Sequence, residues 1–337
     1  MLRKCLEALK KYSLEIVVVD TGSEDDSKKV ALEYTDKVYE YKWNDNFASA
    51  RNYAAEMASN NLILALDTDE IVEQLDEETL EIHEPNTVGR MLRINEYMRY
   101  EEQYRAKERI SRLYDRRLFH FIGRIHEQVS SKNLTEGEVI CKDIPVTVLH
   151  FGYDGSKEKI ANKAERNIRL LKLDLIENGD NPYILYQLGK SYYMLGNYSN
   201  SCEYFGRALS YDLNPRLEYV QDMVETYGYA LVNTGNAVVA EELLGNSEVY
   251  EAFCRWADYC FMMGIVYMNC EKYEKAIEQF EEAINRPARM EGTNSYKAYY
   301  NIGVILECLG KLTEAVYYYK QCGSYQAAMA RLKKLKI

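Results

Sequence analysis

The chain has 337 residues, which is enough for two domains that each bury a core. Hydrophobic residues make up 47% of it and exclude a disordered chain, while the net charge of -11 argues against a nucleic-acid binder. No apolar run reaches the roughly 18 residues that a membrane span needs. The N-terminus lacks the apolar core of a signal peptide, and the eight cysteines form no C-x-x-C pair. We therefore expect a cytoplasmic protein with reduced thiols and no membrane span.

The first 150 residues alternate between patterns typical of strands and helices. The run EIVVVD (15–20) is continuously apolar before its aspartate, as in a buried parallel strand. Ser23 can cap the helix that follows. This alternation indicates an open α/β sheet, which becomes mixed in its later part. We expect helices over 2–9, 24–34 and 48–58, and strands over 15–20, 36–41, 61–67, 87–102, 112–123 and 144–151.

From about Lys157 onward the strands disappear, and 159–179 reads as one amphipathic helix. A degenerate repeat follows, in which a glycine is succeeded by a small residue 12 positions on and a large residue 16 positions on. This pattern lets two helices approach closely and resembles the tetratricopeptide repeat, whose nominal period is about 34 residues. The second copy fits worst, and 324–337 is expected to be a capping helix. The four sets are Gly189, Ser201 and Phe205; Gly228, Ala240 and Leu244; Gly264, Ala276 and Phe280; and Gly303, Ala315 and Tyr319.

Three acidic residues end the apolar strand expected over 61–67: Asp67, Asp69 and Glu70. Ligands of open α/β sheets bind beyond the carboxyl ends of the strands, where these residues are expected to lie. Asp67 and Asp69 are two positions apart, so both can point the same way in extended chain. A divalent cation such as Mg²⁺ or Mn²⁺ would relieve their repulsion. The alternative is a helix that begins at Glu70 and is capped by Thr68 or Asp69.

The stretches EIVVVDTGSEDDS (15–27) and FASARNYAAEMASNNLILALDTDE (47–70) together resemble the family-2 glycosyltransferases of the GT-A fold. The subgroup that is most similar carries tetratricopeptide repeats after the transferase domain and includes peptide S-glycosyltransferases. The resemblance covers roughly residues 1–175. It implies a GT-A-like α/β nucleotide-sugar domain at 1–155, a connecting helix at 156–180, and about four tetratricopeptide-like repeats with a capping helix at 181–337.

The resemblance also implies an activity: metal-dependent transfer of a hexose from a nucleotide-sugar donor to a peptide, protein or glycan acceptor. The donor is expected to be a UDP-sugar and the cation Mg²⁺ or Mn²⁺. Asp20 would bind the base of the nucleotide, Arg51 the nucleotide or its phosphates, and Asp67 the ribose or the metal. Asp69 and His150 would hold the cation, and Glu127, in a loop that begins with Gly123, would be the catalytic base.

Each of these residues also has a purely structural interpretation. Asp20 could close the turn after its strand, and Arg51 could be a surface helix arginine. His126 and Glu127 could form a structural hydrogen-bonded pair, because the family more often has Glu-Asp there. His150 could be a core histidine with satisfied hydrogen bonds.

The sequence departs from the family at its start. Family members have a strand before the first helix, whereas this chain begins in that helix at Met1. The lack of this strand would leave two neighbouring strands with unpaired edges, so we expect weak nucleotide-sugar binding. A start site placed too late, an inactive copy, or another segment in the gap would each account for the difference.

The alternative function is a truncated, inactive transferase domain that serves with the repeats as a protein-binding scaffold. A nucleotidyltransferase would need a glycine-rich, basic nucleotide loop, and none is visible.

Overall fold

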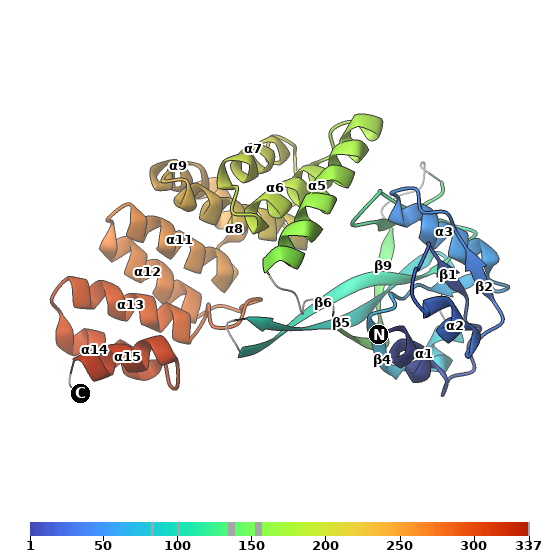
Figure 1. The fold of residues 1–337 in the computed structure, drawn as a ribbon. Coiled ribbons are helices and arrows are strands. Elements are labelled where there is room, and N and C mark those ends of the chain that lie inside the picture. Colours follow the sequence, from blue (N-terminus) through green and yellow to red (C-terminus); the bar gives the residue numbers. More distant parts are fainter. Residues whose placement is uncertain (82–83, 100–101, 134–138, 152–156, 336–337) are drawn as a thin grey trace. The chain divides into compact units, whose positions relative to one another are not determined.

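The computed structural model of the chain describes residues 1–81, 84–99, 102–133, 139–151 and 157–335 (Figure 1). Contacts divide the chain into two compact units, Met1–Ile176 and Glu177–Ile337, and each is described by itself. No helix within the described ranges is both long enough and apolar enough to cross a membrane.

The first unit is built on a mixed sheet in which the described strands have the order β3-β6-β5-β9-β4. The long neighbours β5 and β6 are antiparallel, whereas β5 and β9 run parallel. Tyr100 and Glu101, which belong to the strand expected over 87–102, lie outside the described residues. The strands are β3 (Leu62–Leu64), β4 (Glu70–Leu75), β5 (Thr87–Arg99), β6 (Glu102–Asp115) and β9 (Ile140–His150).

Two small sheets complete the strands that the structure describes. Strand β1 (Val18–Asp20) pairs in parallel with β2 (Val38–Glu40), and β7 (Phe119–Ile122) pairs antiparallel with β8 (Gln128–Ser131). Within the described ranges, β1 and β3 each have a single ladder partner, β2 and β6 respectively. The apolar side chains of both strands are only partly buried. Each of the two strands therefore has one edge without a ladder partner among the described residues.

Polar side chains set the ends of several elements in this unit. Helix α2 begins at Ser27, three residues after the start expected from a cap at Ser23; Asp26 is at the N-cap position, and the Asp25 carboxylate accepts the backbone N–H of Ser27. The strand expected over 112–123 is divided between β6 and β7, because Asp115 accepts the N–H of Arg117 in the intervening turn. The helices of the unit are α1 (Leu2–Leu9), α2 (Ser27–Leu32), α3 (Phe47–Met57), α4 (Glu77–Glu81) and α5 (Lys157–Asn178).

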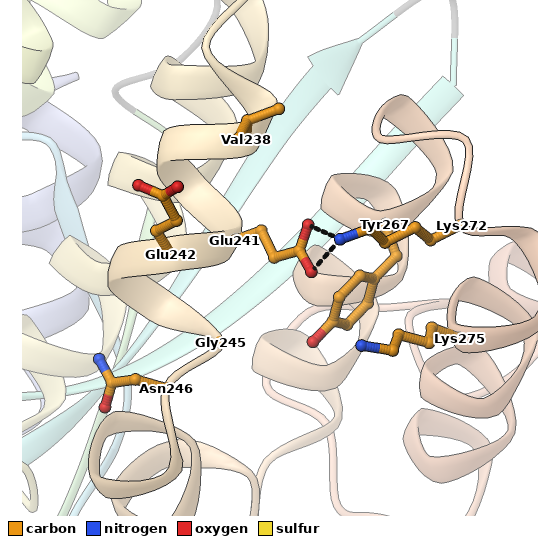
Figure 2. A pocket seen from close by; sticks show the side chains of 8 residues that line it. All are labelled: Val238, Glu241, Glu242, Gly245, Asn246, Tyr267, Lys272 and Lys275. Atoms are coloured by element: carbon orange, nitrogen blue, oxygen red, sulfur yellow. Dashed lines mark hydrogen bonds and ion pairs between the residues drawn. The ribbon is translucent and has the colours of Figure 1, made fainter.

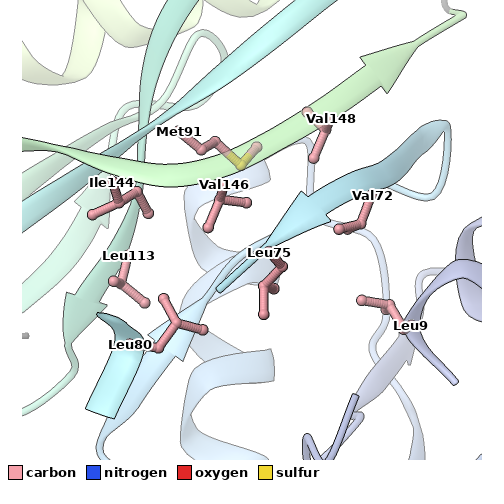
Figure 3. Close-up of a cluster of buried hydrophobic side chains, with 9 residues drawn as sticks. All are labelled: Leu9, Val72, Leu75, Leu80, Met91, Leu113, Ile144, Val146 and Val148. Carbon is pink, nitrogen blue, oxygen red and sulfur yellow. The ribbon is translucent and has the colours of Figure 1, made fainter. Parts of the chain in front are cut away.

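Apolar side chains cover both faces of the central sheet. Leu113 and Tyr114 are neighbours on β6 and are both buried, yet they belong to different clusters, because successive side chains of a strand point to opposite faces. The cluster around Tyr114 includes Ala48 and Ala55 of α3, so this helix covers that face. The other cluster contains Leu9, Val72, Leu75, Leu80, Met91, Leu113, Ile144, Val146 and Val148 (Figure 3).

Glu15 ties three segments of the first unit together. Its carboxylate forms an ion pair with Lys37, and it accepts hydrogen bonds from the backbone N–H of Ser59 at 2.9 Å and from the Asn60 amide at 2.9 Å. Burial alone would raise the pKa of Glu15, but the hydrogen bonds from Lys37 and Ser59 hold it at about 2, below its ordinary value of 4.5. The folded state therefore favours the ionised form.

The Glu15→Gln variant is expected to lower the stability of the first unit by about 1–2 kcal/mol at pH 7, since solvent still reaches part of the carboxylate. The difference in the free energy of unfolding between wild type and variant is fully present above pH 4.5 and is lost as the pH falls toward 2. The reason is that Glu15 is protonated at a higher pH in the unfolded chain than in the folded one. Urea unfolding followed by Trp43 fluorescence in a Trp256→Phe background measures this difference. The exposed Glu7→Gln variant is the control. A difference that stays constant between pH 7 and pH 3 would contradict the prediction.

The second unit is all helical, and its packing confirms the expected repeat. In three of the four copies, a Cβ added at the glycine would lie within 2.6 Å of the large residue 16 positions on: Gly189 against Phe205, Gly264 against Phe280, and Gly303 against Tyr319. The small residues of the pattern are fully buried. The helices are α6 (Pro182–Met194), α7 (Tyr198–Ala208), α8 (Glu218–Asn233), α9 (Ala237–Leu244), α10 (Ser247–Phe253), α11 (Ala257–Asn269), α12 (Tyr273–Ile284), α13 (Tyr296–Cys308), α14 (Leu312–Gln321) and α15 (Gln326–Lys334).

The second copy differs from the other three. A Cβ added at Gly228 would meet the Met262 sulfur at 2.2 Å, so the side chain packed on this glycine comes from α11. Leu244, which stands at the position of the large residue, is nevertheless buried. The glycine thus permits a close helix contact here too, but with the following copy.

Candidate functional site

The acidic residues that follow β3 form a tight turn that leads into β4. The Glu70 carboxylate accepts the backbone N–H of Asp67 at 2.9 Å, and the Glu70 N–H donates to the Asp67 carbonyl at 3.0 Å. Glu70 is fully buried and begins strand β4, so the alternative of a helix starting at this residue is wrong. Burial and the neighbouring Asp67 raise the pKa of Glu70. One of the three acids is therefore structural and fixes the turn that carries the other two.

Asp69 and His150 face each other across two paired strands. Strand β4 pairs antiparallel with β9, and the register sets Glu70 opposite His150. The Asp69 Oδ2 atom lies 3.4 Å from His150 Nε2, with the imidazole buried and the carboxylate partly exposed. The pairing of β4 with β9 thus brings together two side chains that are far apart in the sequence.

Asn95 of β5 fixes which nitrogen of His150 faces Asp69. The Asn95 amide nitrogen donates to the Glu108 carboxylate, so its Oδ1 is the atom that faces His150 Nδ1, at 2.7 Å. That oxygen can only accept, so Nδ1 carries the proton and Nε2 turns toward Asp69. A neighbour of this kind, which orients the ring, is the usual partner of a metal-binding histidine.

The atoms Asp69 Oδ2 and His150 Nε2 are suited to hold a cation between them. With Nδ1 protonated, a neutral imidazole presents a lone pair to the carboxylate, and two acceptors 3.4 Å apart repel each other unless a positive charge lies between them. A proton on the imidazole can supply it, and this proton lowers the pKa of Asp69. A divalent ion can also supply it, and oxygen with imidazole ligands suits Mn²⁺ or Mg²⁺. The described residues contain no cluster of three or more His, Cys, Asp and Glu side chains that could hold a metal.

Next to this pair, two arginines and two carboxylates form a closed ring of ion pairs, which we call the arginine–carboxylate ring: Arg51, Asp67, Arg112 and Glu127. Arg51 contacts Asp67 Oδ1 through Nη2 at 2.5 Å and Glu127 Oε1 through Nε at 2.6 Å. Arg112 contacts Asp67 Oδ2 at 3.2 Å and Glu127 Oε1 at 3.7 Å. The four residues come from α3, the β3–β4 turn, β6 and the loop before β8. Burial alone would raise the pKa of Asp67, but the two guanidinium groups lower it.

The arginine–carboxylate ring lies against an aromatic side chain. The guanidinium carbons of Arg51 and Arg112 lie 5.3 and 5.9 Å from the ring centroid of Phe121, which is buried and packs edge-on against Tyr114. Within the described part of the chain, the buried Nε of Arg112 has no hydrogen-bond partner. Such a group costs about 1–3 kcal/mol. Burial and the nearby Arg51 lower the pKa of Arg112.

The loop that carries Glu127 is held in an unusual backbone conformation. His126 has a φ of 53°, which is uncommon for a residue other than glycine, and Gly123 has a φ of 92°. Helix α5 holds this loop from one side: the Asp174 carboxylate accepts the N–H of Arg124 at 2.9 Å, and the Asn167 amide lies 3.4 Å from His126 Nε2. The structural alternative, a hydrogen-bonded pair of His126 and Glu127, is not among the interactions described, and the described ion pairs of Glu127 are with the two arginines.

Asp20 lies at the end of β1, and its Oδ1 accepts the backbone N–H groups of Gly22 at 3.2 Å and Ser23 at 2.9 Å. Burial would raise the pKa of Asp20, but these hydrogen bonds lower it. The structure thus brings the predicted residues Arg51, Asp67 and Glu127 into one network. It also brings Asp69 and His150 into one pair, while the hydrogen bonds described for Asp20 are those of a turn-closing residue.

Sequence reasoning missed two residues that shape this site, Asn95 and Arg112, and it did not reveal that Glu70 closes the turn. Asn95 lies in a strand, and nothing in its local pattern distinguishes it from other polar strand residues. A charged residue that alternates with apolar ones was the available signal for Arg112, which stands between the partly buried Ile110 and the buried Tyr114 on β6.

The second unit has a pocket of its own, with a volume of about 360 Å³ (Figure 2). Glu241 of α9 and Lys272, just before α12, form a two-pronged ion pair at 2.6 Å on one wall. Lys275 lies 5.4 Å from the ring centroid of Tyr267. The pocket is lined by Val238, Glu241, Glu242, Gly245, Asn246, Tyr267, Lys272 and Lys275.

Comparisons with known proteins agree with the division of the chain into a sheet-containing unit and a helical unit. Residues 1–131 match the model of glycosyl transferase family 2, and residues 182–215, 257–286 and 296–330 match tetratricopeptide repeat models. A TPR repeat-containing protein of Synechococcus elongatus is 29% identical over 198 residues, which cover 56% of this chain and 48% of that protein. The SPbeta prophage-derived glycosyltransferase SunS of Bacillus subtilis is 25% identical over 223 residues, 62% of this chain and 50% of that protein. The chain thus spans about half the length of these relatives.

The chain is also similar to two solved structures. A crystal structure of MamA is 25% identical, with a TM-score of 0.41 over 55% of this chain and 99% of that one. A crystal structure of YrrB, a TPR protein with an unusual peptide-binding site, is 19% identical, with a TM-score of 0.42 over 52% of this chain and 86% of that one. The family models and the described topology confirm the expected mixed-sheet domain followed by helical repeats.

Proposed function

We propose that this protein is a metal-dependent glycosyltransferase. Its N-terminal part matches glycosyl transferase family 2, and tetratricopeptide repeats follow. It transfers a hexose from a UDP-sugar to a peptide, protein or glycan acceptor. The observation that carries this proposal is the approach of Asp69 Oδ2 to His150 Nε2 beside the arginine–carboxylate ring. The similarity to the glycosyltransferase SunS supports it.

Asp69 and His150 would hold the cation in this proposal. Bound there, Mg²⁺ or Mn²⁺ would act as a Lewis acid on the diphosphate while the bond between sugar and phosphate breaks. Asn95 and Glu108 keep the imidazole nitrogen of His150 directed at Asp69. Glu70 keeps the turn closed, so that the Asp69 carboxylate is in place before substrate binds.

Three residues would bind the rest of the donor. Asp20, with its Oδ1 fixed by two backbone N–H groups, accepts a hydrogen bond from the uracil through its other oxygen. Arg51 contacts the diphosphate, and Asp67 contacts the ribose. Arg51 is also the ion-pair partner of Asp67, so the two groups that bind neighbouring parts of the donor are positioned together.

Glu127 would act on the acceptor side as the general base. It takes the proton of an acceptor hydroxyl or thiol as that atom bonds to the anomeric carbon, and the bond to phosphate breaks with release of the nucleoside diphosphate. The anomeric centre inverts, because a single displacement replaces one bond with another. Acceptor binding is assigned to the repeats, since stacked helical repeats form surfaces that suit extended peptides.

The reaction would take place in the cytoplasm. All eight cysteines are free thiols, as is usual in a reducing compartment. Cys260 and Cys322 are buried in the second unit, where burial raises the pKa of both thiols.

A donor screen tests the proposal. The chain is incubated with UDP-glucose, UDP-galactose or UDP-N-acetylglucosamine and with Mn²⁺ or Mg²⁺, and UDP release is measured with and without EDTA. Release that requires the metal and one of these donors is expected. If no donor gives UDP and calorimetry detects no binding of UDP with Mn²⁺, the transferase proposal fails and the scaffold function is favoured.

Replacing Asn95 with leucine is expected to weaken Mn²⁺ binding by roughly tenfold, because the imidazole of His150 loses the partner that orients it. Calorimetric titration of the protein with MnCl₂ measures the change. Glu73→Gln, an exposed position on β4, is the control. Equal Mn²⁺ affinities of the Asn95→Leu variant and the wild type would show that Asn95 does not support a metal ligand.

A further inference from the structure

Arg112 is a ring member to which the proposed reaction assigns no task. It lies on β6, only 7% of its surface is exposed, and its guanidinium contacts both carboxylates of the arginine–carboxylate ring. Its Nε is buried and has no hydrogen-bond partner within the described part of the chain. Burying an incompletely paired guanidinium is unfavourable for folding, so stability alone is a poor reason for an arginine at this position.

We propose that Arg112 is a positioning residue that fixes Asp67 on the donor side and Glu127 on the acceptor side of the same reaction. This inference rests on the proposed function and adds a residue to it. Arg112 touches neither substrate, and it acts through the two carboxylates that do.

The contacts of Asp67 show why a second arginine is needed. Arg51 holds the Oδ1 atom alone, and a carboxylate held at one oxygen can rotate about its bond to Cβ. Arg112 holds Oδ2, so the two guanidinium groups together fix the plane of the carboxylate. A fixed plane directs the remaining lone pairs of Asp67 in one direction, which a ribose-binding group requires.

The contacts of Glu127 have a different pattern that suits a base. Arg51 and Arg112 both approach Oε1, at 2.6 and 3.7 Å. Oε2 is the oxygen that neither guanidinium holds in these ion pairs, and it is the one that we assign to proton transfer. Glu127 comes from a loop and Asp67 from a turn, so without Arg112 only Arg51 would bridge the two segments within the ring.

The geometry also indicates why the residue is an arginine. Its planar guanidinium lies 5.9 Å from the Phe121 ring centroid and reaches two carboxylates through different nitrogens. A lysine carries one compact ammonium group and could pair well with only one of them. The Arg112→Lys variant keeps the positive charge but has only one nitrogen to pair with the two carboxylates. It therefore distinguishes an effect of positioning from an effect of charge alone.

A double-mutant cycle tests the proposal on the full chain, with donor and metal as in the screen above. The variants are Arg112→Gln, Arg112→Lys, Glu127→Gln and the double variant of Arg112→Gln with Glu127→Gln. Arg109→Gln, on the same strand but paired with the exposed Asp143 at 3.7 Å, is the matched control. Melting temperatures are recorded for every variant.

Arg112→Gln is expected to lower kcat by roughly 100-fold while the donor KM changes less than about threefold. Arg112→Lys is expected to melt close to the wild type and still to lose at least about tenfold in kcat. In the Glu127→Gln background, Arg112→Gln is expected to lower kcat by only about tenfold more, because one of the two carboxylates through which it acts is already disabled. Arg109→Gln should keep wild-type kcat and KM.

Three results would overturn the inference. Full activity of a folded Arg112→Lys variant would show that only the charge matters. Losses that multiply in the double variant would show that Arg112 does not act through Glu127. An Arg112→Gln variant that melts lower but keeps its kcat would show a purely structural role. These outcomes all require an active wild type, whereas an inactive wild type contradicts the proposed function itself and the inference with it.

Discussion

An Asp69→Asn variant is expected to transfer sugar roughly 1,000-fold more slowly than the wild type. The Asp69 Oδ2 atom lies 3.4 Å from His150 Nε2, and a cation held between them needs the negative charge of the carboxylate. An asparagine amide has the same shape but no charge, and its N–H can donate to the imidazole nitrogen. The substitution therefore fills the cation position with a hydrogen bond and leaves the fold intact. The measurement is kcat for UDP release with saturating Mn²⁺.

The variant needs a control for folding and one for charge. Its melting temperature without metal should match that of the wild type within a few degrees, because the hydrogen bond replaces the ion pair. Asp36→Asn, at an exposed position, removes one negative charge and should leave kcat unchanged. If Asp69→Asn keeps a Mn²⁺-dependent kcat within tenfold of the wild type, the cation is not held by Asp69.

A Gly264→Ala substitution is expected to destabilise the second unit by about 2–3 kcal/mol. An added Cβ would lie 2.6 Å from the Phe280 ring, which is fully buried and cannot move away. Alanine normally stabilises a helix interior relative to glycine by about 0.5–1 kcal/mol, so the clash must exceed this gain. Urea unfolding followed by Trp256 fluorescence in a Trp43→Phe background measures the change.

Gly206→Ala is the matched control, since Gly206 also lies inside a helix, α7. The nearest atom to a Cβ added there is the Tyr227 hydroxyl at 3.6 Å, an ordinary contact. This variant is expected to stabilise the unit by a few tenths of a kcal/mol to about 1 kcal/mol. Opposite signs for the two variants support the repeat packing. A stabilised Gly264→Ala variant would mean that α11 and α12 pack less closely than described.

The repeat half of the chain was predictable because its signal is local and recurs. A glycine and a large residue 16 positions on lie on two consecutive helices, and the same contact forms in three of four copies. The exception, Gly228, packs on Met262 of the next copy, and no spacing rule within one copy could reveal that. Periodicity thus predicts contacts between adjacent helices and fails where the partner belongs to a later one.

The site was predictable only in part, because strand pairing creates it. Asp69 and His150 come together through the pairing of β4 with β9. The sequence did not predict β4, because the residues from Glu70 onward could also have begun a helix. The resemblance to a family implied that both residues hold the cation. The local sequence pattern alone could not predict that they lie close together. The role of Asn95 could not be predicted from the sequence for the same reason, because its contact with His150 depends on the parallel register of β5 and β9.

The acids after β3 show how similar residues acquire different tasks. Asp67, Asp69 and Glu70 look alike in sequence, but the buried Glu70 closes the turn while Asp67 binds two arginines. Burial and partner decide between these outcomes, and both depend on strands distant in the sequence. The acidic stretch after the apolar strand indicated a charged site, and only tertiary contacts separate its structural acid from the proposed functional ones.

Helix α5 has a practical consequence for anyone who wishes to isolate the sheet-containing half. Asn167 and Asp174 support the segment that presents Glu127, although they lie beyond residue 131, where the match to the family ends. A fragment stopped at residue 155 would keep every proposed ligand and base but lose this support. Truncations should therefore retain the chain through Ile176, the last residue of the first compact unit.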